Sequence, residues 1–256
     1  MSRIARVGAL AANPSFRTLR RSLDVYYGDP THEARMTALY GRFLKPGGLA
    51  FDIGAHVGDR IGAFRQLGAR VVALEPQPLC YRVIEAVYGD NPDVTLMRAA
   101  CGAHTGKIVL RVNSANPTVT TASADFIAAA DGAQGWEGQT WDATVEAKMT
   151  TLDALIAEHA VPDFAKIDVE GFEADVLAGL SQPIPALSFE FTTIQRDVAY
   201  RCLDRLAELG AYRFDFSLGE NHALAGELLS REDMAARIAA LPHEANSGDV
   251  YGVLER

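Results

Sequence analysis

The sequence predicts an α/β protein with a mainly parallel sheet covered by helices on both faces. Short apolar segments with the length of strands alternate with amphipathic segments with the length of helices. Two of the strand segments carry an acid near their carboxyl end: Asp52 stands two residues before Gly54, and Glu75 directly precedes Pro76. Ligands of parallel sheets bind at the carboxyl ends of strands, so we expect a nucleotide-type cofactor site there.

Composition narrows the class of protein. The chain has 256 residues, 48% hydrophobic and 22% charged, which suits a globular protein with a sizeable core. A formal net charge of −9 argues against a nucleic-acid binder. No apolar run has the length of a membrane span. The cysteines, Cys80, Cys101 and Cys202, lack metal-type spacing, and we interpret them as reduced thiols of a cytoplasmic protein.

The expected elements follow in a regular order. Residues 1–45 form an N-terminal helical segment, which Pro46-Gly47-Gly48 ends. A single domain then covers 46–256. We expect its strands at 49–53, 70–74, 94–98, 107–113, 164–169, 186–191, 212–218 and 249–254. We expect its helices around 61–67, 78–88, 150–156, 173–180 and 196–209.

An insert at 114–147 interrupts this alternation. It is rich in Asn, Ser, Thr, Gly and Ala, and we expect a long loop, which in a compact domain is usually functional or disordered. Trp136 and Trp141 lie in it. They either anchor the loop or form a flat apolar wall against an acceptor molecule.

The glycine turn discriminates between cofactors. A dinucleotide site favours G-x-G-x-x-G, and the turn Gly54-Ala-His-Val-Gly58 lacks the middle glycine. Asp52 would repel a pyrophosphate but suits the ammonium and sulfonium groups of S-adenosylmethionine. Gly54 and Gly58 let the backbone approach the ligand. Glu75 is placed to accept hydrogen bonds from both ribose hydroxyls.

These motifs resemble the FkbM family of S-adenosylmethionine-dependent methyltransferases. The resemblance is carried by Phe51–Gly58, Ala73–Pro76, Thr151–Asp153, Lys166–Gly171 and the strand 188–191. It implies a class I, Rossmann-like fold with a seven-stranded sheet, and O-methylation of a hydroxyl on a sugar, glycan or natural product.

The resemblance also implies roles for residues around the cofactor. Asp52, Gly54 and Ala55 would line the methionine moiety, and Glu75 would hold the ribose. The adenosine would be bordered by Pro76 and Gln77, and the adenine by Ala99 and Ala100. His56, where the family often has asparagine, is either a solvent-facing turn residue or a contact to the cofactor carboxylate.

The segment Lys166–Gly171 supplies the reacting end. A hydroxyl acceptor must lose a proton during methyl transfer, which calls for a general base. Asp168 is the first candidate and Glu190 the second; both could instead position the acceptor. Asp168 would also lie near the transferable methyl, so we count it among the cofactor-binding residues as well. Glu170 could equally be a carboxylate at a helix N-terminus, and Lys166 could pair with one of these acids.

We predict no metal. Asp168, Glu170 and Glu190 offer hard oxygen ligands, but the family pattern does not require an ion, and no His or Cys spacing indicates zinc.

Two other classes of function stay open: an NAD-dependent oxidoreductase, and a methyltransferase-like binding protein without catalysis. The expected partner is a small-molecule hydroxyl acceptor. The acceptor's identity and the oligomeric state, including a homodimer, are left open.

Overall fold

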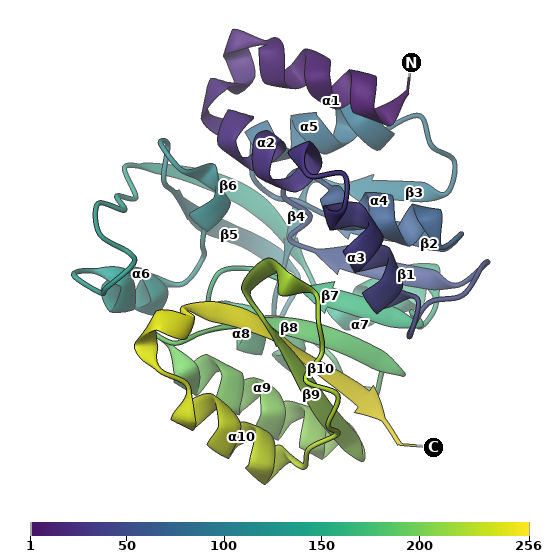
Figure 1. Ribbon diagram of the computed structural model, residues 1–256, viewed down its shortest axis with the longest axis vertical. Helices are drawn as coiled ribbons and strands as arrows, with labels where there is room; N and C mark the ends of the chain where they lie inside the picture. Colours follow the sequence, from purple (N-terminus) through teal and green to yellow (C-terminus); the bar gives the residue numbers. More distant parts are fainter. Residues whose placement is uncertain (1, 256) are drawn as a thin grey trace.

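The computed structural model describes residues 2–255, so Met1 and Arg256, at the ends of two expected segments, lie outside it. A seven-stranded sheet forms the centre of the molecule (Figure 1). Its strands, in spatial order, are β3 (Val94–Met97), β2 (Arg70–Leu74), β1 (Leu49–Ile53), β7 (Phe164–Ile167), β8 (Ala186–Thr192), β10 (Ser247–Leu254) and β9 (Tyr212–Leu218).

The sheet is mainly parallel, as predicted. β1 pairs in parallel with β2 and β7, and the parallel pairing continues to β3 and β8. Only β10 runs antiparallel, between β8 and β9. The order reverses between β1 and β7, so the carboxyl ends of β1, β2, β7 and β8 open onto one crevice at this switch point.

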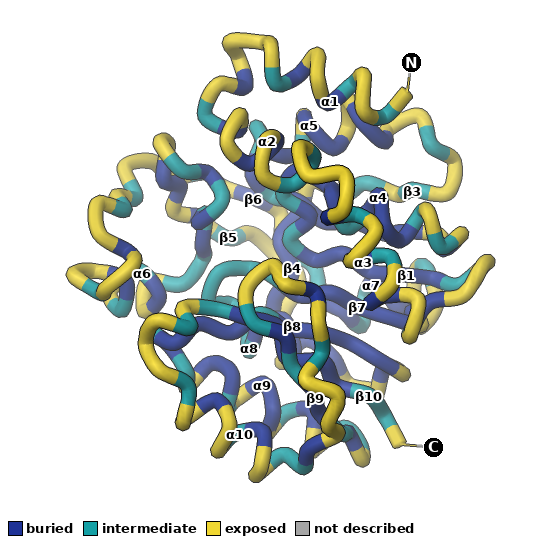
Figure 2. The backbone as a smooth tube through the Cα atoms, in the orientation of Figure 1, coloured by how far each residue is buried: buried dark blue, intermediate teal, exposed yellow. Residues whose placement is uncertain are grey.

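Helices cover both faces of the sheet, because strand residues alternate between two apolar cores. Phe51 faces the core shared with α7, α8, α9 and α10, whereas its neighbour Ala50 faces the core shared with α1 to α5. The central strands are buried and the outer helix surfaces exposed (Figure 2). The helices are α1 (Arg3–Ala12), α2 (Arg20–Gly28), α3 (His32–Tyr40), α4 (Asp59–Gln66), α5 (Pro78–Tyr88), α6 (Ala124–Ala130), α7 (Leu152–His159), α8 (Glu173–Ala178), α9 (Arg196–Leu209) and α10 (Arg231–Ala240).

Side-chain caps set the starts of helices α5 and α7. The side chain of Gln77 accepts hydrogen bonds from the amides of Leu79 and Cys80, and Pro78 occupies the first turn of α5. Thr151 caps α7 by accepting from the amide of Ala154 at 3.1 Å. Among residues 2–255, no helix combines the length and the apolar character that a bilayer span requires.

The insert differs from the predicted loop. It contains α6, and its last residues begin β6 (Ala143–Thr150), which forms a second, three-stranded sheet between β4 (Ala99–Cys101) and β5 (Gly106–Val112). The short Ala99–Cys101 segment, expected as a strand exit, is thus a strand. β6 was missed because only Ala147 and Met149 of its inward face are buried. Residues 143–150 nonetheless alternate apolar and polar side chains, which was an available signal of a strand. α10 was not expected either.

Candidate active site

A cavity of about 320 Å³ lies at the carboxyl edge of the sheet. Its walls come from the ends of β1, β2, β7 and β8, from β4, and from the insert. Seven of the predicted cofactor-binding residues line it: Gly54, His56, Glu75, Pro76, Ala99, Ala100 and Asp168. Glu190, predicted only as a catalytic residue, lines it too. Four others do not line it: Asp52, Ala55, Gly58 and Gln77.

At the glycine turn, the backbone of Gly54 packs directly against the backbone of Asp168. Gly54 has φ +89°, and a Cβ added there would meet the carbonyl oxygen of Asp168 at 1.8 Å. His56 also has a positive φ of 48°. Its amide donates to Glu75 Oε2 at 2.8 Å, across the gap between β1 and β2. The turn is therefore a fixed edge of the cavity rather than a mobile loop.

Glu75 is held by backbone amides on both oxygens. Oε1 accepts from Gln77 N at 2.7 Å and Oε2 accepts from His56 N at 2.8 Å. Burial nevertheless raises its pKa to about 8, because the amides only partly offset the loss of solvation. Each oxygen retains a lone pair that can accept a hydroxyl from a bound nucleoside.

Asp52 directly precedes Ile53, which lines the cavity, and is itself 1% exposed. Neither of its carboxylate oxygens has a hydrogen-bond partner among residues 2–255. Burial raises its pKa to about 7, although Arg60 acts in the opposite direction. A buried carboxylate without a donor is costly unless it is protonated or meets a cation. This observation fits a cationic cofactor.

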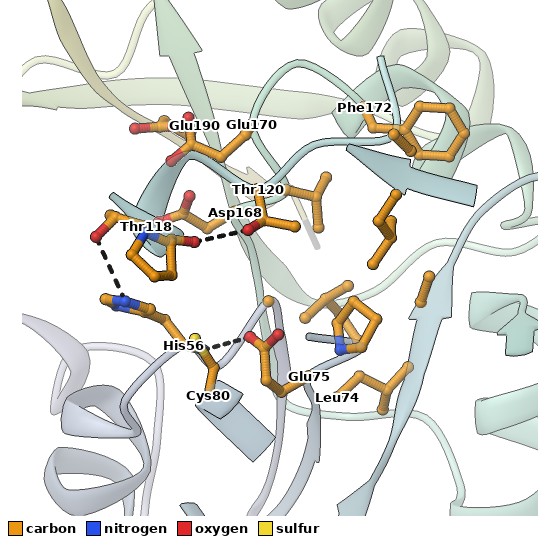
Figure 3. Close-up of a pocket in the computed structure, with 18 of the residues that line it drawn as sticks. His56, Leu74, Glu75, Cys80, Thr118, Thr120, Asp168, Glu170, Phe172 and Glu190 are labelled. Carbon is orange, nitrogen blue, oxygen red and sulfur yellow. Dashed lines mark hydrogen bonds between the residues drawn. The ribbon is translucent and has the colours of Figure 1, made fainter. Parts of the chain in front are cut away.

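At the end of the cavity away from Glu75, three carboxylates come together (Figure 3). Asp168, Glu170 and Glu190 each present an oxygen within 4.8 Å of the other two. Glu170 has a left-handed backbone with φ 55°, an uncommon conformation for a residue other than glycine. The cluster could hold an ion, and its members are hard oxygen ligands.

The three acids differ in their electrostatics. Lys166 is fully buried and donates to Asp168 at 3.0 Å and to Asp249 at 2.8 Å. Burial would raise the pKa of Asp168, but Lys166 and Arg60 outweigh it and hold that pKa below its usual value. The pKa values of Glu170 and Glu190 rise well above normal, through burial first and then through repulsion from Asp168.

The insert supplies the third wall. Trp136 lines the cavity, and its indole Nε1 donates to Asn246 Oδ1 at 3.0 Å. Trp141 donates to the carbonyl of Val119 at 2.8 Å, and both tryptophans pack edge-on against Phe126. Trp136 thus anchors the insert and also forms cavity wall, so its two expected roles are compatible, whereas Trp141 only anchors.

Sequence reasoning missed several lining residues, chiefly Arg60, Thr118, Phe172 and Glu220. Arg60 contacts Asp59 at 3.2 Å, Glu220 at 3.4 Å and Asp168 at 3.8 Å. Its position in the first turn of α4, next to the glycine turn, was an available signal. Glu220 had none beyond following a strand and Gly219.

The strand order, the single antiparallel strand and a cavity at the switch point define a class I, Rossmann-like methyltransferase. Residues 52–216 match the methyltransferase FkbM domain. The chain belongs to this family, and it is an S-adenosylmethionine-dependent methyltransferase. The family match therefore excludes the alternative of an NAD-dependent oxidoreductase.

Several solved structures show a distant likeness to this chain. One is precorrin-6y C5,15-methyltransferase from Geobacter metallireducens GS-15, with 13% identity, 88% of this chain and 87% of that chain covered, and a TM-score of 0.43. Another is a TehB-like SAM-dependent methyltransferase from Corynebacterium glutamicum ATCC 13032 Kitasato, with 9% identity, 94% and 96% covered, and a TM-score of 0.45. A search of curated proteins finds no match.

Proposed function

We propose that this methyltransferase transfers a methyl group to a hydroxyl of a sugar, glycan or natural-product small molecule. The observation that carries the proposal is the pair Glu170 and Glu190, which faces Asp168 in the same cavity as Glu75. A raised pKa makes a carboxylate, once ionised, a stronger acceptor of a hydroxyl proton. Trp136 and Phe172 offer apolar surface against which a ring can pack.

The proposed cofactor subsite is the end of the cavity around Glu75. Glu75 accepts the ribose hydroxyls, Pro76, Ala99 and Ala100 border the base, and Gly54 leaves room for the methionine moiety. Asp52, behind this wall, contributes negative potential toward the cationic end. When bound, S-adenosylmethionine supplies an electrophilic methyl on a sulfonium, which leaves as a neutral thioether.

The chain's own task is then to orient the acceptor and to take its proton. Asp168, ionised and fixed by Lys166, orients the hydroxyl. We assign the proton acceptor to Glu190, which reverses the order of the two candidates expected from sequence. The reason is electrostatic: the lowered pKa of Asp168 makes it the weaker base.

Two substitutions test these roles. Glu190→Gln should lower kcat by about 100-fold or more, the range of a lost general base, and leave the dissociation constant for S-adenosylhomocysteine unchanged. Asp168→Asn should raise KM for the acceptor as well as lower kcat. The assay uses a panel of sugars and hydroxylated natural products with a radiolabelled methyl donor.

The outcomes separate the alternatives. If Glu190→Gln keeps full turnover, Glu190 is not the base. If no hydroxyl compound accepts the label while S-adenosylhomocysteine binds, O-methylation is wrong for this chain. Binding without turnover on any acceptor would favour a non-catalytic role.

A further inference from the structure

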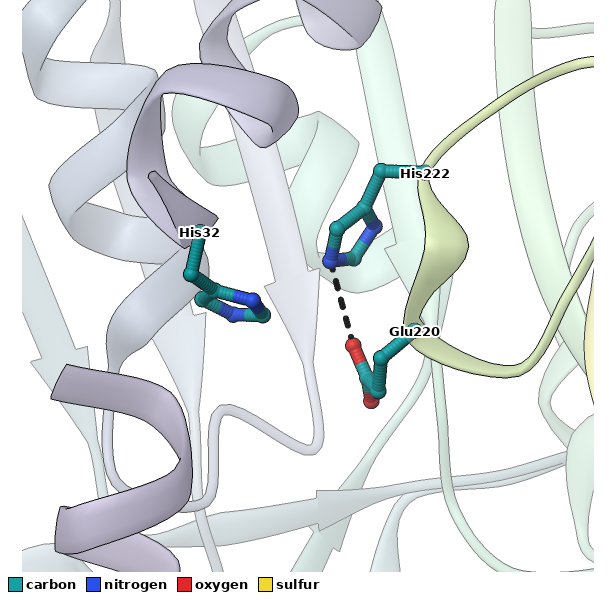
Figure 4. A group of neighbouring side chains, drawn as sticks. All are labelled: His32, Glu220 and His222. Carbon is teal, nitrogen blue, oxygen red and sulfur yellow. Dashed lines mark ion pairs between the residues drawn. The ribbon is translucent and has the colours of Figure 1, made fainter. Parts of the chain in front are cut away.

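Two histidines from opposite ends of the chain meet beside the cavity. His32 is the first residue of α3, and His222 follows β9. Their exposed fractions are 3% and 7%, and their ring centroids lie 5.0 Å apart. Figure 4 shows both rings and the carboxylate of Glu220 turned toward one another. Buried polar rings placed in this way require partners.

Glu220 completes a set of three donors. Its Oε2 lies 3.2 Å from Nε2 of His222, and its other oxygen faces Arg60 at 3.4 Å. One ligand atom from each of His32, Glu220 and His222 lies within 4.8 Å of the others. Nε2 of His222 is buried and makes no contact with the geometry of a hydrogen bond among residues 2–255. The nitrogen faces Oε2 of Glu220, and a shared ion would satisfy both groups.

Asp59 holds the imidazole of His32. Its Oδ2 lies 3.2 Å from Nε2 of His32. When Nε2 donates a proton to this carboxylate, Nδ1 keeps its lone pair. A carboxylate that orients a ligating imidazole in this way is the usual outer-shell arrangement of histidine metal sites.

The local charge also favours a cation. Asp59 and Glu220 both contact the guanidinium of Arg60, at 3.2 Å and 3.4 Å. Two carboxylates against one guanidinium leave this cluster net negative.

We propose that His32, His222 and Glu220 bind one divalent transition-metal ion of the zinc class. Two imidazoles and one carboxylate are a common ligand set for such ions. The ligand atoms of a tetrahedral ion lie about 3.3 Å apart at bond lengths near 2 Å, so the three side chains draw together on binding. Positions 32 and 220–222 are too distant in sequence for a spacing motif, so no zinc site was predicted from the sequence.

The site ties the N-terminal segment to the chain after β9. Because Glu220 also lines the cavity, the ion fixes one of its walls. Binding of the ion does not depend on the proposed acceptor chemistry. The site is also separate from the carboxylates at Asp168, Glu170 and Glu190, which contain no imidazole.

The test is metal binding to the full chain after removal of bound ions with a chelator. Titration with Zn²⁺ should give one ion per chain, and Co²⁺ should give the visible absorption bands of a tetrahedral site. His222→Ala should weaken Zn²⁺ binding on the order of 100-fold or more, and Asp59→Asn by about 10- to 100-fold, as expected for a ligand and an outer-shell partner. His104→Ala, which removes an exposed histidine, should change it less than about twofold.

Binding of S-adenosylhomocysteine, measured on each variant, shows that the fold is intact and tests the cofactor site separately. The proposal is overturned if the wild-type chain binds no stoichiometric Zn²⁺, or if His222→Ala binds it as tightly as the wild type. His32→Gln provides a second ligand variant, in which the cobalt bands should also be lost.

Discussion

Single residues determine how the cavity holds charge. Glu75 illustrates this best, because it is buried, it accepts two backbone amides, and its pKa still rises to about 8. Because the pKa of Glu75 is about 8, this carboxyl group is mostly protonated at lower pH. Its ability to accept two ribose hydroxyls therefore increases as pH rises through about 8.

The first prediction concerns this pH dependence. The affinity for S-adenosylhomocysteine should increase from pH 6 to pH 9, by up to about tenfold per pH unit below 8, since one proton is released on binding. Glu75→Gln imitates the protonated form and should bind weakly with a flat profile. Calorimetry at several pH values measures both. A wild-type profile as flat as that of the variant would show that Glu75 is ionised throughout.

Gly54 gives a second prediction at the same scale. Gly54→Ala should destabilise the protein by about 3 kcal/mol or more and weaken cofactor binding, because the new Cβ meets the carbonyl of Asp168. Gly132→Ala is the matched control: it has a positive φ of 71° but nothing within 4 Å of the added carbon. It should cost only about 1–2 kcal/mol of left-handed strain. Chemical denaturation compares the two, and equal losses would contradict the steric argument.

At the scale of elements, ion pairs tie strands that are not neighbours. Lys166 on β7 reaches Asp249 on β10, with β8 lying between them. The second carboxylate on Lys166, Asp168, belongs to the reacting end. The same buried amine therefore stabilises the sheet and fixes the position of a site residue.

Removing this amine should be costly. Lys166→Met leaves two acids near the core without their cation, and we expect a loss of about 3–5 kcal/mol in the free energy of unfolding. Lys107→Met breaks the exposed pair with Glu146 and should change stability by less than about 1 kcal/mol. Urea denaturation of both variants decides the matter; similar effects would mean that the buried pairs add little.

The lowered pKa of Asp168 makes its contribution to stability depend on pH. The pKa of Asp168 is lower in the folded protein than its ordinary value, so its contribution to stability is present above that ordinary value and is lost as pH falls through the folded one.

For the molecule as a whole, the cofactor cavity joins parts of the chain that are distant in sequence. The turn after β1, the end of β8, the insert and the segment after β9 all reach it. Ligand binding should therefore stabilise the whole fold rather than one element.

Thermal unfolding tests this expectation. S-adenosylhomocysteine at 100 times its dissociation constant should stabilise the fold by about 2.7 kcal/mol, which for a chain of this size raises Tm by about 5–10 °C. NAD at the same concentration should leave Tm unchanged. A shift with NAD and none with S-adenosylhomocysteine would contradict the assignment of the cofactor.

The sequence alone determined most of the fold and one end of the site. Strand length, apolar patterning and glycine punctuation are local properties, and they predicted the seven strands of the central sheet and most of its helices. The motif residues around Gly54, Glu75 and Asp168 do line one cavity, because parallel strands bring their carboxyl ends together by rule.

Only the tertiary structure decided the rest. The second sheet, the contacts of Arg60, and the meeting of His32 with Glu220 and His222 join positions far apart in the chain. The opposite pKa shifts of Asp168 and of Glu170 and Glu190 were also decided there, since a pKa depends on burial and on neighbours brought by folding. Local sequence patterns do not specify the distances between such residues, and these distances determine both which side chains can share an ion and how far each pKa shifts.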